Sequence, residues 1–203
     1  MAELTITTFL TLDGVMQAPG GPTEDTSGNF NRGGWVFSYF DTDMGEIMTG
    51  IFGKVDAFLL GRGTYDIFAG YFPKVTDEKD VIAHKLNTLP KYIASRSAQN
   101  FTWHNSKPVR DVVPEVKALK ARYKSEVQVH GSAGLAQTLI ENDLIDEFRL
   151  LVFPVTVGSG KRLFGNGTVP AAMSLVSTRT SGSGVVMQIY RRAGALKTGS
   201  FGA

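Results

Sequence analysis

The chain has 203 residues, 42% of them hydrophobic and 20% charged, which is enough for one sizeable core but little for two domains. Its 21 basic and 19 acidic residues leave a net charge of +2, too small for the basic surface that nucleic-acid binding needs. The absence of cysteine excludes disulfides, thiolate nucleophiles and cysteine-ligated metal sites.

The expected cellular compartment and metal content are inferred from signal, membrane and metal-binding patterns that are not found in the sequence. The amino-terminal segment MAELTITTFL has no basic region and no cleavage site, and the longest apolar run, LLVFPVTV, is too short to span a bilayer. We therefore expect a cytoplasmic protein without a membrane partner. His84, His104 and His130 show no metal-ligand spacing, so we expect surface or structural histidines and no metal.

The first part of the chain predicts a strand, a long loop and a helix. Alternating β-branched residues indicate a strand from about Glu3 to Phe9, followed by a turn at Asp13-Gly14. Residues 15–34 are crowded with Gly, Pro, Asn, Ser and Thr, and a loop of this length is typical of a lid or a binding loop. Apolar residues at helical spacing predict a helix from about Asp43 to Phe52, with Asp43 as its cap.

The rest of the chain alternates apolar runs with helical patterns. Strands are predicted at residues 56–60, 91–97, 126–130 and 147–157, a short helix at 65–69, and longer helices containing Val112 to Tyr123 and Leu135 to Leu139. Residues 171–180 and 185–192 indicate an antiparallel hairpin around the connection SGSG. We therefore predict one α/β domain with a mixed sheet over residues 1–192 and a flexible tail over residues 193–203.

The stretch DAFLLGRGTYDIF raises the question of why a buried strand is followed by two glycines, an arginine and a threonine. A helix start offers free amides and the positive end of the helix dipole, and glycines let an anion approach the backbone. Arg62 adds a guanidinium suited to phosphate, and Thr64 adds a hydroxyl. The alternative is that Gly61 and Gly63 only turn the chain while Arg62 is solvated.

Two further segments of similar composition follow predicted strands. Gly131-Ser132-Ala133-Gly134 also lies between a strand and a helix, and Ser95-Arg96-Ser97 ends another strand. Three such strand ends suit a dinucleotide phosphate better than a single phosphate. No Gly-x-Gly-x-x-Gly and no Walker motif is present, so neither a Rossmann nor an NTPase site is indicated.

Several segments together resemble a known family. These are FLTLDGVMQAPGG, GGWVFSYFD, LLGRGTYDIFAGYFP and VHGSAGLAQTLIENDLIDEFRLLVFPVTVGSGKRLF. They are similar to the dihydrofolate reductase-like family, which includes the reductase half of the riboflavin-biosynthesis deaminase-reductase. The resemblance implies a three-layer α/β/α fold with NADPH across the carboxyl ends of the strands and hydride delivery to a small heterocycle.

The resemblance also implies roles for residues of this sequence. Gly61, Arg62, Gly63 and Thr64 would hold cofactor phosphates, and Gly14 would lie near the nicotinamide. Ser95 and Arg96 would bind the 2′-phosphate, with Ser97 also at the cofactor. The pyrophosphate would be bound by Gly131, Ser132, Ala133, Gly134 and Leu135. Preference for NADPH would rest on Arg62 and Arg96. The zinc deaminase half has no counterpart here, because its cysteine ligands are absent.

The substrate side is less determined by the sequence. Asp13 is a candidate proton donor or substrate anchor, although it can simply form the turn with Gly14. Trp35 and Phe37 could stack on a ring or belong to the core, and Asp41 could face the substrate. The family's phosphate-recognition segment is replaced by GGWVFSYFDTD, so a non-catalytic NADPH-binding protein is the alternative function. Family members are often dimers, and we expect a homodimer.

Overall fold

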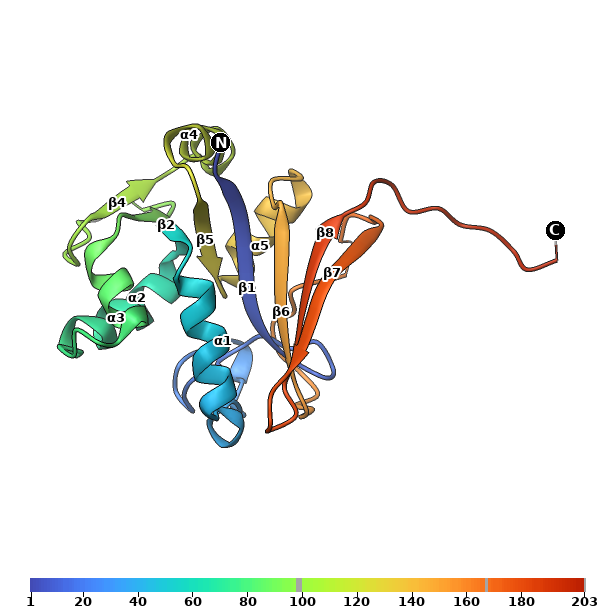
Figure 1. The fold of residues 1–203 in the computed structure, drawn as a ribbon, viewed down its shortest axis with the longest axis horizontal. Coiled ribbons are helices and arrows are strands. Elements are labelled where there is room, and N and C mark those ends of the chain that lie inside the picture. The colour runs from blue at the N-terminus through green and yellow to red at the C-terminus, as the bar shows by residue number, and fades with distance from the viewer. Residues whose placement is uncertain (98–99, 167, 203) are drawn as a thin grey trace.

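The computed structural model describes residues 1–97, 100–166 and 168–202. In this part of the chain one eight-stranded sheet runs through the molecule in the order β4-β3-β2-β5-β1-β6-β8-β7 (Figure 1). The strands are β1 Glu3–Thr11, β2 Val55–Gly61, β3 Lys91–Ala94, β4 Ser106–Val109, β5 Glu126–His130, β6 Glu147–Phe153, β7 Met173–Thr180 and β8 Val186–Arg192.

Helices cover both faces of the sheet, which confirms the three-layer prediction. They are α1 Thr42–Phe52, α2 Arg62–Tyr71, α3 Val81–Thr88, α4 Val112–Arg122 and α5 Ala133–Glu141. The apolar side chains of α1, α2 and α3 join one core cluster with the loop after β1, whereas those of α4 and α5 join a second cluster across the sheet. Short 3-10 turns lie at Ser27–Asn29, Phe37–Tyr39 and Phe72–Lys74.

The sheet is parallel through most of its width and antiparallel at one end. All neighbouring pairs from β4 to β6 are parallel, while β8 pairs antiparallel with β6, and β7 with β8. The predicted carboxyl-terminal hairpin is therefore confirmed. Because parallel strands point the same way, the carboxyl ends of β2, β3, β4 and β5 meet at one edge, where ligands bind in open α/β sheets.

Some predicted boundaries were wrong. The cap of α1 is Asp41, whose Oδ1 accepts a hydrogen bond of 2.9 Å from Met44 N, whereas Asp43 lies inside the helix and accepts from the amide of Gly182. The strand predicted at 91–97 ends at Ala94, so Ser95 to Ser97 form a loop. The strand predicted at 147–157 ends at Phe153, just before a proline.

Two elements were missed by the sequence analysis. α3 is only eight residues long, and its apolar side is narrow, with Ala83 and Leu86 as its buried residues. β4 has the sequence SKPV, and its Pro108 suits only an edge strand, which is where β4 lies.

The carboxyl-terminal residues leave the body of the molecule (Figure 1). Backbone hydrogen bonds join Ala172 to Ala193 and Gly194, and the chain then runs outward as an exposed extension. Its flexibility stays a prediction. In the described ranges, no helix is long and apolar enough to cross a membrane.

Candidate functional site

A cleft of about 1580 Å³ lies at the carboxyl edge of the parallel strands. Four segments that follow strands β2 to β5 contribute to its lining: Gly61 to Thr64, Ser95 and Arg96, Arg110 to Val113, and Gly131 to Leu135. The three segments that the sequence analysis singled out therefore share one cavity. The first and the last of them begin at Gly61 and Gly131, far apart in the chain, and the parallel sheet brings them together.

Two helices begin at this cleft without a side-chain cap. The cap positions of α2 and α5 are Gly61 and Ser132. Neither residue provides a side-chain hydrogen bond to the first amides of its helix. The first amides of a helix have no intrahelical acceptor, so both starts can offer backbone donors and the positive end of the helix dipole to a ligand. Gly131 and Ser132 both have positive φ, of +54° and +61°; for Ser132 this is a strained conformation, of a kind that clusters at functional sites.

The Ser132 hydroxyl connects the two helix starts. Its Oγ accepts a hydrogen bond of 2.9 Å from Gly61 N and lies 2.9 Å from the hydroxyl oxygen of Thr64. A Cβ added at Gly61 would stand 3.1 Å from both Cβ and Oγ of Ser132. The close approach of the two strand ends therefore favours glycine at position 61, because a larger residue would push Ser132 away.

Arginines lie along the same side of the cleft. Arg62 forms an ion pair of 2.7 Å with Asp66, and its guanidinium lies 5.7 Å from the centre of the Phe101 ring. Arg96 and Arg110 are exposed and follow the neighbouring strands β3 and β4, whose last residues Ala94 and Val109 are register partners. Two guanidinium groups therefore lie just after the ends of adjacent strands and line one cavity, an arrangement suited to binding a phosphate.

The opposite part of the cleft is formed by the loop after β1 and by apolar side chains of α1. Met16 to Asp25 contribute several lining residues, and Met48 and Phe52 contribute apolar surface. Lys161 Nζ forms an ion pair of 2.5 Å with Asp25. The expectation that residues 15–34 form a binding loop is consistent with this placement, although Val15, Ala18 and Phe30 of the loop belong to the core.

Glu24 is the carboxyl group of this loop best suited to donate a proton to a ligand in the cleft. Its Oε2 accepts hydrogen bonds of 2.5 Å and 3.0 Å from the amides of Gly20 and Gly21. Burial raises the pKa of Glu24 above its ordinary value; the two amides oppose this, and the neighbouring Asp25 carboxylate adds to it. A half-buried carboxyl with a raised pKa in a cleft is a candidate acid.

Asp13 lies outside the set of residues that line the cleft. Its carboxylate accepts from the Thr11 hydroxyl at 2.6 Å and from the amides of Val157 and Gly158 at 3.1 and 2.7 Å. The Thr11 hydrogen bond is the main cause of a lowered pKa, and the two amides add to it against desolvation. The Asp13 carboxylate therefore joins the turn after β1 to the loop that contains Val157 and Gly158. Gly14 completes this turn with φ of +79°.

The other residues proposed for the substrate also lie outside the lining. The Trp35 indole is buried, donates 2.9 Å to the carbonyl of Gln17 and packs edge-on against Phe153. Phe37 is 86% exposed. Asp41 caps α1 and accepts a second hydrogen bond from Ser183 N, and Ser97 likewise does not reach the cavity.

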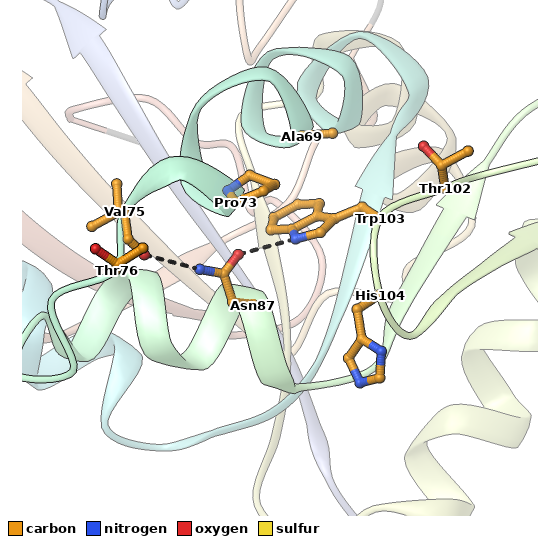
Figure 2. Close-up of a pocket in the computed structure, with 8 residues that line it drawn as sticks. All are labelled: Ala69, Pro73, Val75, Thr76, Asn87, Thr102, Trp103 and His104. Atoms are coloured by element: carbon orange, nitrogen blue, oxygen red, sulfur yellow. Dashed lines mark hydrogen bonds between the residues drawn. The ribbon is translucent and has the colours of Figure 1, made fainter.

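A second, smaller cavity of about 700 Å³ lies among α2, α3 and the segment before β4 (Figure 2). Its lining shares no residue with the cleft among those described. Asn87 donates to the carbonyls of Phe72 and Val75, and its Oδ1 accepts from the Trp103 indole at 3.0 Å. The hydrogen-bonding groups of Asn87 and Trp103 are thus used within the protein, which indicates a structural role for this cavity.

Among the cleft residues that the sequence analysis did not predict, three carry side chains suited to binding or proton transfer. Arg110 follows a strand that was itself missed, and Glu24 lies in a loop without regular periodicity. His130 was expected to be a structural or surface residue, yet it lines the cleft, whereas His84 and His104 are exposed. Its position directly before Gly131, at a strand end of anion-binding composition, could have indicated from the sequence that His130 lies at the site.

Comparison with known proteins places the chain among reductase-related sequences. The model of the RibD C-terminal domain matches residues 2–187. Two uncharacterized proteins of Bacillus subtilis are similar: YyaP is 32% identical over 185 residues, which cover 89% of this chain and 90% of YyaP, and YwjB is 28% identical over 141 residues, which cover 68% and 74%.

Solved structures share the fold at lower identity. A putative riboflavin biosynthesis protein from Shewanella sp. PV-4 has a TM-score of 0.69 at 18% identity, covering 95% of this chain and 99% of its own. A pyrimidine reductase-like protein from Corynebacterium diphtheriae has 0.62 at 14%, covering 94% and 92%. Dihydrofolate reductase from Enterococcus faecalis, complexed with NADP(H), has 0.58 at 12%, covering 94% and 96%.

Proposed function

Because the chain belongs to the RibD C-terminal domain family, we propose that it is an NADPH-dependent reductase that delivers hydride to a small heterocyclic substrate. The single observation that carries the proposal is the convergence of two uncapped helix starts and two strand-end arginines on one large cleft. Such a cleft fits an elongated, multiply phosphorylated ligand better than a small neutral one.

The donor set of the cleft fits the phosphates of NADPH. The amides that begin α5, from Ala133 to Leu135, would hold the pyrophosphate, together with Gly61 to Thr64 at the start of α2. Ser95, Arg96 and the newly identified Arg110 would bind the 2′-phosphate. A Cβ at Gly63 or Gly134 would meet no described atom within 4 Å, so the backbone is open to a ligand at both helix starts.

The chain would bind and orient, while the cofactor when bound supplies the hydride. The apolar side chains of Met48 and Phe52 would exclude water from the reacting ring. Of the two acids considered, Glu24 suits the proton-donor or substrate-anchoring role better than Asp13, because it lines the cleft and has a raised pKa. The substrate would be a flat heterocycle with a reducible C=N or C=O bond.

Cofactor binding and turnover test the proposal in sequence. Titration with NADPH, followed by cofactor fluorescence, is expected to show saturable binding in the micromolar range or tighter. Absorbance of bound NADPH is then expected to fall with one class in a panel of pterins, pyrimidines, flavins and quinones. No binding at high micromolar NADPH would refute the proposed function.

A non-catalytic NADPH-binding protein is the second candidate. It is favoured by the replacement of the family's phosphate-recognition segment by GGWVFSYFDTD. In this segment Trp35 and Val36 are buried in the core and Phe37 is exposed at the surface. Tight NADPH binding with no oxidation against the whole panel would select this function. Oxidation that is lost in a Glu24→Gln variant, with NADPH binding retained, would select the reductase.

We also propose that the protein is a homodimer. β7 lies at the sheet edge and is exposed along its length, with Leu175 and Val176 52% and 53% exposed. An exposed edge strand with apolar side chains supports pairing with a second copy. Light scattering is expected to give twice the chain mass, and a Val176→Lys variant is expected to give the monomer.

A further inference from the structure

A chain of buried polar groups runs through the sheet behind the cleft. Arg149 donates from Nη1 and Nη2 to the Glu126 carboxylate at 2.9 and 2.7 Å and from Nε to Glu147 at 2.8 Å. The Glu147 carboxylate also accepts from Arg191, which binds Glu3 at the surface. Each buried charge therefore has an opposite partner and several hydrogen bonds, so the unit is fixed in place.

Gln128 connects this unit to the cleft. It is fully buried, and its Nε2 donates 2.7 Å to both Glu126 Oε2 and the carbonyl of Ile51. Since both partners can only accept, the Gln128 amide has one orientation, with Oε1 directed to His130 Nε2 at 3.1 Å. His130 Nε2 must therefore carry the proton, and Nδ1 is left with an unshared pair.

The His130 ring borders the cleft. His130 lines the cavity, and its ring stacks on Phe52 with centroids 4.6 Å apart. Over the described residues, the fully occluded side-chain atoms without a hydrogen-bond partner are hydroxyl oxygens, of Thr5, Thr7, Thr8, Ser106 and Thr168. Among the described residues no hydrogen bond to Nδ1 is found and Nδ1 is not one of these occluded atoms, so it is the ring nitrogen left for a ligand.

The ring stays neutral over the working range of pH. Burial lowers the pKa of His130 to about 3, and the Arg149 guanidinium adds to this effect. A neutral imidazole with Nε2 protonated offers a hydrogen-bond acceptor and no positive charge. Such an acceptor nitrogen offers no attraction to a phosphate and selects for a ligand group that donates a hydrogen bond, such as an N–H.

We propose that His130 positions the ligand in the cleft: its Nδ1 accepts a hydrogen bond from an N–H group of the bound nitrogen heterocycle, and Gln128 holds the ring for this contact. The inference rests on the proposed function for the identity of the ligand. The donor is either the carboxamide of the nicotinamide or an amino or ring N–H of the substrate. His130 is thus assigned as a specificity-determining residue.

Nitrogen NMR of the histidine rings tests this directly, because the chain has three histidines and His84 and His104 are exposed references. The expected spectrum of the unliganded protein shows His130 with its proton on Nε2. Added NADPH is expected to shift Nδ1 if the carboxamide is the donor. If NADPH leaves Nδ1 unchanged and a 2-aminopyrimidine or pterin shifts it, the substrate is the donor.

Two variants give a second measurement. His130→Phe keeps a ring beside Phe52 but has no acceptor, and it is expected to lose about tenfold in affinity for the ligand that shifts Nδ1. His130→Asn keeps an acceptor oxygen close to the Nδ1 position and is expected to retain more of that affinity. Equal losses in the two variants would contradict the proposal.

The outcomes separate this inference from the proposed function. A proton on Nδ1, or an Nδ1 signal that neither NADPH nor the heterocycles shift, overturns the role of His130 even if NADPH binds. Absence of NADPH binding refutes the reductase, whereas the tautomer and the response to heterocycles still decide the inference.

Discussion

Helices of this protein begin in two different ways. α1 and α3 start with aspartates, Asp41 and Asp80, whose carboxylates accept from the amides of Met44 and Ala83 at 2.9 Å. α2 and α5 start at the cleft with Gly61 and Ser132 and have no side-chain cap. A helix whose own side chain satisfies its first amides needs no ligand. A helix without a cap, at the carboxyl edge of a parallel sheet, has donors available for an anion.

The largest effect is expected from the arginines beside the open helix starts. An Arg96→Ala and Arg110→Ala double variant should weaken NADPH about 100-fold, because two charge-assisted contacts with the 2′-phosphate are lost. NADH, which lacks that phosphate, should be weakened far less. Arg179→Ala, which removes a guanidinium paired with Glu46 away from the cleft, is the matched control. Equal losses for both cofactors would contradict the assignment of the 2′-phosphate site.

An effect of pH on stability is expected from the strand end that precedes α5. The pKa of His130 is about 3 in the folded protein against an ordinary value of 6.5, so between these values the unfolded chain binds the additional proton. Stability should therefore fall as pH decreases below 6.5, by about 1.4 kcal/mol per pH unit from this residue. Urea unfolding across this range measures it. A His130→Phe variant with an unchanged pH slope would refute it.

A smaller effect is expected at a capped helix. Asp80→Ala removes the acceptor for Ala83 N and should destabilise the protein by about 1 kcal/mol without changing NADPH affinity. Asp80→Asn keeps a capping oxygen and should recover most of this loss. Thermal unfolding and cofactor titration of both variants provide the comparison. A change in NADPH affinity in Asp80→Ala would remove the distinction between capped and open helix starts.

The smallest effect is expected from Asp66, which pairs with Arg62 at the rim of the cleft. Its side chain is 49% exposed, so the ion pair contributes little to stability. Asp66→Asn removes a negative charge near the proposed phosphates and should tighten NADPH binding by a few-fold, with stability nearly unchanged. Weaker NADPH binding would indicate that Asp66 holds Arg62 in its binding position.

The elements that were predicted well are those with strong periodicity. The buried strands β1, β2 and β5, the amphipathic α1 and α4, and the terminal hairpin all follow from apolar spacing. α3 and β4 were missed, because a short helix and a proline-containing edge strand carry little periodic signal. With β4 unrecognised, Arg110 could not be placed beside Arg96.

The candidate site was predicted on its phosphate-binding side and not on its substrate side. Glycines, hydroxyls and arginines at strand ends mark helix starts directly in the sequence, and Gly61 to Thr64 and Gly131 to Leu135 do line the cleft. The substrate side depends on how an irregular loop folds back. Trp35 and Asp41 stabilise that loop and α1, whereas Glu24 and His130 reach the cavity through contacts that no local pattern shows.

Backbone amide NMR during NADPH titration tests the account most directly, because capped and open helix starts are read in one spectrum. We expect the amide signals of Gly63, Thr64, Gly134 and Leu135 to shift strongly, and those of Met44 and Ala83, which already bind carboxylates, to stay in place. Binding of NADPH that leaves the starts of α2 and α5 unshifted would contradict the account.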